Sequence, residues 1–131
     1  MPLLELQTNA KLDDPKAFIK EFSEVVFVAY LQTLAAELLK TPLEYICVNY
    51  KYSEHLAFAG TFEPALLLSV ASVEGLDAES NALHSQKLFG FFEKKLGVKD
   101  HRGYIVFVNP SKDFIGFHST TAAKIFASKP E

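Results

Sequence analysis

The order strand, helix, strand occurs twice in this chain of 131 residues, and this repetition limits the folds open to it. We expect six main elements in chain order, with strands at residues 4–8, 45–52, 65–73 and 104–108 and helices at residues 15–40 and 78–96. Two such units predict an α+β fold, in which a four-stranded mixed sheet carries both helices on one face, related by a pseudo-twofold axis.

Capping residues mark the ends of both predicted helices. Asp14 precedes Pro15, an acidic cap followed by proline at the first helical position, where its missing N–H costs nothing. Asp77 is the predicted N-cap of the second helix. Gly97 stands at its C-terminal end, where helices commonly finish with a glycine in the left-handed backbone conformation. The Thr41-Pro42 pair ends the first helix.

Two apolar segments stand out. Residues 25–31 are apolar on every side of the first helix, yet this segment is too short to cross a bilayer. We expect it to be buried or to contact another copy of the chain; the alternative is a break in the helix. Residues 65–73 are almost continuously apolar, which predicts a central strand buried on both faces.

The second face of the predicted sheet carries no helix and is apolar. A bare face of this kind indicates association with other copies of the chain. We expect one domain at residues 1–118, ending in a short strand near residues 114–117, and a polar tail at residues 119–131.

Composition excludes several classes of function. The formal charge is −3 and no basic run is present, so nucleic acid is not an expected partner. The single cysteine, Cys47, excludes an intrachain disulfide and lies in an apolar strand pattern, which predicts a reduced thiol in the core. The four histidines have no metal-site spacing, and we expect neither a metal nor a cofactor. No leader sequence precedes the first strand, which predicts a cytoplasmic protein and leaves leader-independent secretion open.

The N-terminus offers an unusual base. If an aminopeptidase removes Met1, Pro2 becomes a secondary amine at the start of an apolar strand. An α-amino group titrates near pH 8, and burial lowers the pKa of an amine, so a neutral nitrogen could take a proton from a carbon next to a carbonyl. If Met1 stays, the Pro2 nitrogen is an amide without basicity, and proline merely follows the initiator.

Motifs along most of the chain resemble a known family. They are Met1-Pro2 with Thr8-Asn9, Pro42 with Tyr45-Ile46 and Val48, the run at residues 56–65, the segment Ser69-Val70-Ala71-Ser72-Val73, and Arg102-Gly103-Tyr104-Ile105 ahead of Ile115-Gly116-Phe117. Their order and spacing resemble the tautomerase superfamily and, within it, the branch of macrophage migration inhibitory factor and D-dopachrome tautomerase.

The resemblance implies a homotrimer with three active sites at subunit interfaces and a barrel-like core formed by the sheets. It also implies an isomerase that tautomerises small aromatic 2-oxo acids, such as phenylpyruvate, and dopachrome-like compounds without metal or cofactor. Pro2 would be the catalytic base. The implied substrate-binding residues are Lys40, Tyr45 at the rim, Ser72, Val73 through its backbone N–H, Tyr104 from a neighbouring subunit, and Phe117.

The chain departs from the family pattern at several positions. A lysine that binds the substrate carboxylate commonly precedes the proline matched by Pro42, but Thr41 stands there and Lys40 comes one residue earlier. One residue is a rotation of about 100° on a helix, so Lys40 reaches the site only if the helix end is rewound. Otherwise Lys40 is a solvated cation at a helix C-terminus. Val106 replaces a common asparagine, and the first helix is about two turns longer than usual.

Two functions follow from these observations. The first is a tautomerase weaker than the family norm, because polar partners for the substrate carboxylate are replaced. The alternative is a cytokine-like or protein-binding module that acts through a protein receptor and has reduced or no catalysis. The longer helix raises a further possibility, an oligomeric contact that the family lacks.

Overall fold

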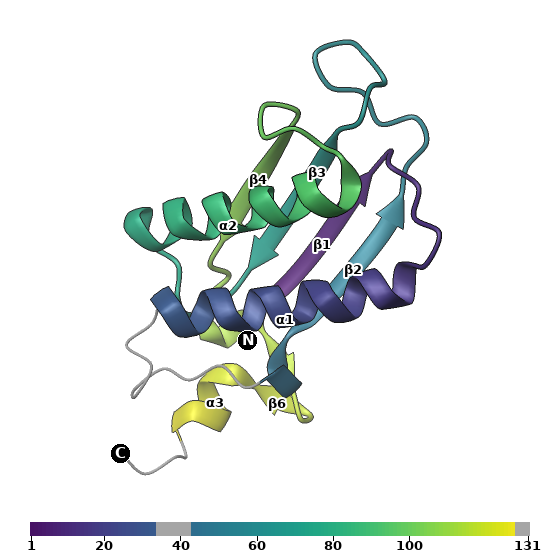
Figure 1. Ribbon diagram of the computed structural model, residues 1–131. Coiled ribbons are helices and arrows are strands. Elements are labelled where there is room, and N and C mark those ends of the chain that lie inside the picture. The colour runs from purple at the N-terminus through teal and green to yellow at the C-terminus, as the bar shows by residue number, and fades with distance from the viewer. Residues whose placement is uncertain (34–42, 128–131) are drawn as a thin grey trace.

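The computed structural model describes residues 1–33 and 43–127. A four-stranded sheet with two long helices forms the body of the molecule (Figure 1). In chain order the elements are β1 (Leu3–Thr8), α1 (Pro15–Thr33), η1 (Leu43–Tyr45), β2 (Cys47–Tyr52), β3 (Leu66–Ala71), α2 (Ala78–Leu96), β4 (Gly103–Val108), η2 (Lys112–Phe114), β5 (Gly116–Phe117), β6 (Thr120–Thr121) and α3 (Ala122–Ala127).

The sheet confirms the predicted duplication. Its strand order is β2-β1-β3-β4. Within each repeat the two strands are parallel, β1 with β2 and β3 with β4, whereas β1 and β3 meet antiparallel at the centre. Both long helices cover the same face of the sheet in Figure 1, so the α+β prediction with two strand-helix-strand units is correct.

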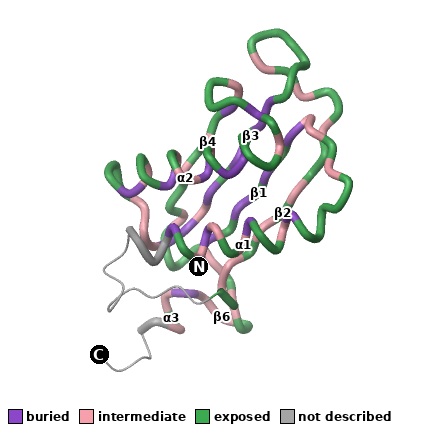
Figure 2. Tube along the Cα trace, viewed as in Figure 1, coloured by how far each residue is buried: buried purple, intermediate pink, exposed green. Residues whose placement is uncertain are grey.

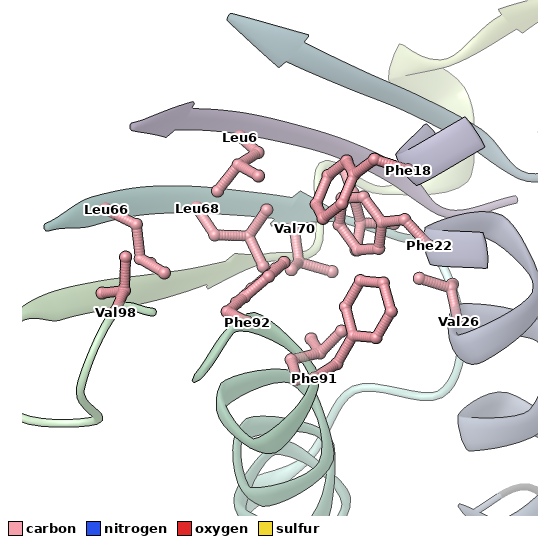
Figure 3. Packing of buried hydrophobic residues seen from close by; sticks show 12 residues of the cluster. Leu6, Phe18, Phe22, Val26, Leu66, Leu68, Val70, Phe91, Phe92 and Val98 are labelled. Atoms are coloured by element: carbon pink, nitrogen blue, oxygen red, sulfur yellow. The ribbon is translucent and has the colours of Figure 1, made fainter. Parts of the chain in front are cut away.

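The core lies between this face and the two helices. In β1 the inward residues Leu4 and Leu6 are buried while Leu3, Glu5 and Gln7 are exposed, the period-two pattern of a sheet with one covered face. Phe22 of α1 and Phe92 of α2 are fully buried, and their ring centroids are 5.3 Å apart (Figure 3). These rings join the helices to each other and to the sheet.

The opposite face of the sheet is uncovered in the single chain. Leu67 of β3 is 42% exposed and Val106 of β4 is 49% exposed, although Leu66 and Leu68 are buried. The prediction that β3 is buried on both faces is therefore wrong for one chain, and the alternation of buried and exposed segments is visible in Figure 2. The continuous apolar run nevertheless remains typical of a strand that a further layer covers.

Cys47 is exposed, so the prediction of a core thiol is also wrong. It begins the edge strand β2 and pairs with Leu3, which is exposed as well. Residues paired across a sheet point to the same side, and this pair points away from the helices.

The predicted helix caps are confirmed. The Asp77 carboxylate accepts a hydrogen bond of 2.7 Å from the Ser80 N–H, and Gly97 ends α2 at φ 70°. Asp14 likewise accepts from the Ala17 N–H ahead of α1. Through its apolar segment α1 continues without a break, with Val26 buried and Val28 48% exposed. The predicted helix end at Lys40 lies outside the described residues.

Several family motifs meet at the far end of β1, where they hold the loop at residues 56–64. The Asn9 amide donates to three carbonyls of this loop, including that of Glu63 at 3.0 Å. Arg102 donates to the Phe58 carbonyl at 2.8 Å, and its guanidinium lies 5.4 Å from the centre of the Phe58 ring. Asn9 and Arg102 therefore shape a loop.

The segment predicted as a polar tail contains regular structure up to Ala127. Strand β6 pairs antiparallel with β5, and α3 follows directly. Ala122 is fully buried beside Met1, and its N–H donates to the Ile115 carbonyl at 2.9 Å. In Figure 1 the N-terminus accordingly lies next to β6 and α3. Within the described residues, no helix is long and apolar enough to span a membrane.

Candidate functional site

Pro2 is fully buried at the entrance of β1. Its carbonyl accepts a hydrogen bond of 3.0 Å from the Cys47 N–H, at the point where β1 and β2 begin to pair. This bond fixes the backbone on one side of the Pro2 nitrogen. The sheet, rather than a mobile terminus, therefore sets the position of the predicted base.

A cavity of about 360 Å³ opens at Pro2. Tyr45 of η1 and Phe117 of β5 form aromatic walls, with their ring centroids 5.5 Å apart and the rings nearly perpendicular. Ile115 adds an apolar surface, and Glu44 also lines the cavity. The volume falls within the range of small-molecule sites, so the cavity can hold a single aromatic ring.

Met1 also lines this cavity. Its side chain is buried against Val73 and Ala122, with Ile115 and Phe117 packed around them. Its ammonium group donates to the Glu74 carboxylate at 2.9 Å. The first residue is therefore held by an apolar contact and by an ion pair.

The turn after β3 carries Ser72, Val73 and Glu74. The Ser72 hydroxyl donates to the Glu74 carbonyl at 2.7 Å, and the Ser72 N–H donates to the Val108 carbonyl at 3.0 Å. Ser72 is fully buried, so its hydroxyl serves this turn, whereas Val73 packs directly on Met1.

The structure brings together only part of the predicted site. Pro2, Tyr45 and Phe117 share the cavity, with Val73 behind Met1. Tyr104 lies elsewhere, because it pairs with Leu67, which in turn pairs with Gln7 near the far end of β1. This level is about 17 Å along the strand direction from Pro2, at 3.3 Å per residue. Tyr104 is 66% exposed and contacts Phe58. Lys40 lies outside the described residues.

Sequence reasoning missed Glu74. Its carboxylate accepts a hydrogen bond from the N-terminal nitrogen, a role that no motif in the sequence indicated. The available signal was local, namely a glutamate directly after Val73 at a strand end. Across the residues that the structure describes, no group of three His, Cys, Asp or Glu side chains is arranged to hold a metal ion.

The same turn is supported from α2 by His84, which is 2% exposed. Its Nε2–H donates to the Gly75 carbonyl at 3.1 Å. Burial lowers the pKa of His84 below its ordinary value of 6.5, while the Gly75 hydrogen bond and the Asp77 carboxylate oppose that effect. The neutral imidazole is the form that this environment stabilises.

The structure therefore predicts loss of stability in mild acid. As the pH falls below about 6.5, the unfolded chain binds a proton at His84 more readily than the folded chain, so the free energy of unfolding falls by at most about 1.4 kcal/mol per pH unit from this residue. Thermal melts at pH 7.5 and 5.5 measure the loss. It should shrink in His84→Asn and persist in His101→Gln, which alters an exposed histidine. An equal loss in all three proteins would contradict the assignment.

Comparison with known proteins agrees with this architecture. The family model described as "Macrophage migration inhibitory factor (MIF)" matches residues 1–123. A macrophage migration inhibitory factor homolog of Trichinella spiralis is 34% identical over 122 residues, covering 92% of this chain and 99% of that protein. A homolog from Trichuris trichiura is 30% identical over 121 residues, with coverage of 92% and 99%.

Solved structures give the same result. The macrophage migration inhibitory factor of Trichinella spiralis superposes with a TM-score of 0.76 at 32% identity, covering 91% of this chain and 98% of that one. A homologue from Prochlorococcus marinus also has a TM-score of 0.76, at 25% identity. This chain therefore belongs to the macrophage migration inhibitory factor family, within the tautomerase superfamily.

Proposed function

We propose that the protein is a cofactor-independent keto–enol tautomerase that acts on small aromatic 2-oxo acids of the phenylpyruvate type and on dopachrome-like compounds. The observation that carries the proposal is the burial of Pro2 beside a cavity walled by Tyr45 and Phe117. Membership of the family supports it. The proposal requires that Met1 be removed, because only then is the Pro2 nitrogen a basic amine.

The reaction needs one proton carrier and a group that stabilises an enolate. The neutral Pro2 amine takes a proton from the carbon next to the substrate carbonyl, so a C–H bond breaks and an N–H bond forms. The ammonium then delivers this proton to the enolate oxygen, which gives the enol. In the reverse direction the amine takes the proton from the enol oxygen, and the ammonium delivers it to carbon. The Val73 N–H is the proposed donor to the developing oxyanion, in a turn braced by Ser72.

We further propose a homotrimer as the active form. The bare apolar face of the sheet supports association, and Tyr104 can line a site only in another copy because it lies at the opposite end of the sheet from Pro2. Lys40 is the proposed partner of the substrate carboxylate.

We place the protein in the cytoplasm, with leader-independent secretion as an open route to an extracellular role.

Ultraviolet monitoring of the enol of phenylpyruvate tests the base. Pro2→Gly replaces the secondary amine with a primary one and is expected to lower kcat/KM by about 100-fold or more, because general base catalysis contributes 10²–10⁴. Pro15→Gly is the control, because it makes the same substitution at an exposed position at the start of α1, outside the cavity. Equal rates for Pro2→Gly and the unaltered chain would remove Pro2 from the mechanism.

A protein-binding module is the second candidate. Retention of Met1 would favour it, because the Pro2 nitrogen is then an amide and the Met1 side chain stays packed against Val73 and Ala122. Such a protein would act through a receptor, as a cytokine does, with reduced or no catalysis. The intact mass of the purified protein separates the two candidates, since a retained methionine excludes the amine-based tautomerase.

A further inference from the structure

The ion pair at the N-terminus contains a residue without a role in the reaction proposed above. The nitrogen of Met1 and Oε1 of Glu74 are 2.9 Å apart, and both side chains are largely buried, with 7% and 18% exposure. An ion pair with so little solvent around it is screened less than one on the surface. The Glu74 carboxylate therefore stabilises a positive charge that forms at the N-terminal nitrogen.

The Pro2 nitrogen is close to the same carboxylate. Three covalent bonds join the Met1 and Pro2 nitrogens through Cα and the carbonyl carbon, so these atoms are about 3 Å apart. Pro2 is anchored through its carbonyl to Cys47, which keeps its nitrogen in place once Met1 is gone. The Glu74 side chain needs to move only by the length of about two bonds to reach the new terminus.

The turn that carries Glu74 is braced from two sides. Ser72 donates its hydroxyl to the Glu74 carbonyl, and His84 donates to the carbonyl of the next residue, Gly75, at 3.1 Å. The Gly75 carbonyl thus ties the turn to α2, and the Ser72 N–H, which donates to the Val108 carbonyl, ties it to β4. A carboxylate on such a turn is presented to the amine with little loss of side-chain freedom.

We propose that Glu74 is the counter-ion of the catalytic amine, pairing with the Pro2 ammonium in the chain without Met1. The inference rests on the proposed tautomerase function. During the reaction the amine gains a proton and a positive charge, and the adjacent carboxylate stabilises this charge where it develops. Glu74 thereby makes Pro2 a stronger base than burial alone would allow.

Other titratable groups surround the amine and must be separated from Glu74. Glu44, Tyr45 and Cys47 line the same cavity from η1 and β2. Lys112 and Asp113 of η2 line a neighbouring cavity against Val73. Among these groups in the described part of the chain, Glu74 is the one that the structure pairs with the N-terminal nitrogen.

The test compares the unaltered chain, Glu74→Gln and Glu74→Asp, all without Met1, with Glu54→Gln as the control. Glu54→Gln makes the same change of charge at an exposed site in the loop after β2. The titration of the amine is followed by NMR with labelled proline. Only Pro2 of the six prolines has a titrating nitrogen, because the other five are internal amides. The pH dependence of kcat/KM for phenylpyruvate is measured in parallel.

Glu74→Gln is expected to lower the titration midpoint of Pro2 by about one pH unit or more, since an opposite charge within 4–6 Å shifts a pKa by 1–3 units. Glu74→Asp should restore part of that difference, and Glu54→Gln should leave the midpoint unchanged. The pH at which kcat/KM begins to fall on the acid side should shift by the same amount as the Pro2 midpoint measured by NMR. Equal midpoints for the unaltered chain and Glu74→Gln would overturn the proposal.

The two readouts separate the pairing from the chemistry. If Pro2 titrates lower in Glu74→Gln but no variant turns over substrate, the counter-ion is supported and the tautomerase proposal fails. If Pro2→Gly abolishes activity but the titration midpoint of Pro2 is the same with and without the Glu74 carboxylate, the tautomerase proposal is supported and the counter-ion proposal is rejected. A circular dichroism melt of each variant confirms that both readouts refer to folded protein.

Discussion

A chain that keeps Met1 is expected to have no tautomerase activity above the rate in buffer. Its Pro2 nitrogen is an amide, and the Met1 side chain fills the space between Val73 and Ala122. Loss of the general base alone removes a factor of about 10²–10⁴ in rate, and the filled site adds to this loss.

The cleanest comparison uses one preparation before and after treatment with a methionine aminopeptidase. Intact mass follows the removal of Met1, and the enol of phenylpyruvate reports the rate on the same samples. Activity should rise in proportion to the fraction of chains without Met1. A chain with Met1 that is as active as the trimmed one would exclude Pro2 as the base.

The largest effect on stability is expected for Phe92→Ala. Phe92 is fully buried and contacts Phe22 and Phe91, so truncation leaves a cavity between α1, α2 and the sheet. Substitutions of this kind cost about 3–5 kcal/mol. We expect the midpoint of urea unfolding to fall accordingly.

Phe114→Ala is the matched control, because it makes the same chemical change at a side chain that is 79% exposed. It should change the free energy of unfolding by less than about 0.5 kcal/mol. Equal losses for the two variants would show that the aromatic cluster around Phe92 does not dominate the core.

The fold was predictable because its determinants are local and repeated. Asp14, Asp77 and Gly97 mark helix ends through hydrogen bonds and backbone angles formed within a few residues of each. The inward residues of β1 alternate, as a sheet with one covered face requires. Such features need no knowledge of distant contacts, so a sequence displays them directly.

The burial of the second sheet face was predicted incorrectly because sequence reports hydrophobicity rather than the identity of the covering layer. Leu67 is as apolar as Leu66, yet only Leu66 faces a helix-covered layer within one chain. The burial of Cys47 was predicted incorrectly for the same reason, because an apolar pattern in an edge strand does not show which side faces the helices.

The site was only partly predictable. Pro2, Tyr45 and Phe117 followed from the resemblance, and the structure brings these three to one cavity. Glu74 was not found because its partner is 73 residues away in the chain, a separation that no local pattern encodes. Asn9 and Arg102 were recognised as motif residues, but only the structure shows that both hold a loop.

The hydrogen bond between Ala122 and Ile115 holds the start of α3 against Met1. This contact limits where a tag or dye can be attached to the protein. A fusion tag placed upstream would keep the Pro2 nitrogen in a peptide bond and would push against α3. Deletion from residue 119 onward would instead expose the same nitrogen to bulk water. Reagents for purification or imaging therefore belong on an exposed loop side chain such as Glu54, which follows β2 at the opposite end of β1 from Met1.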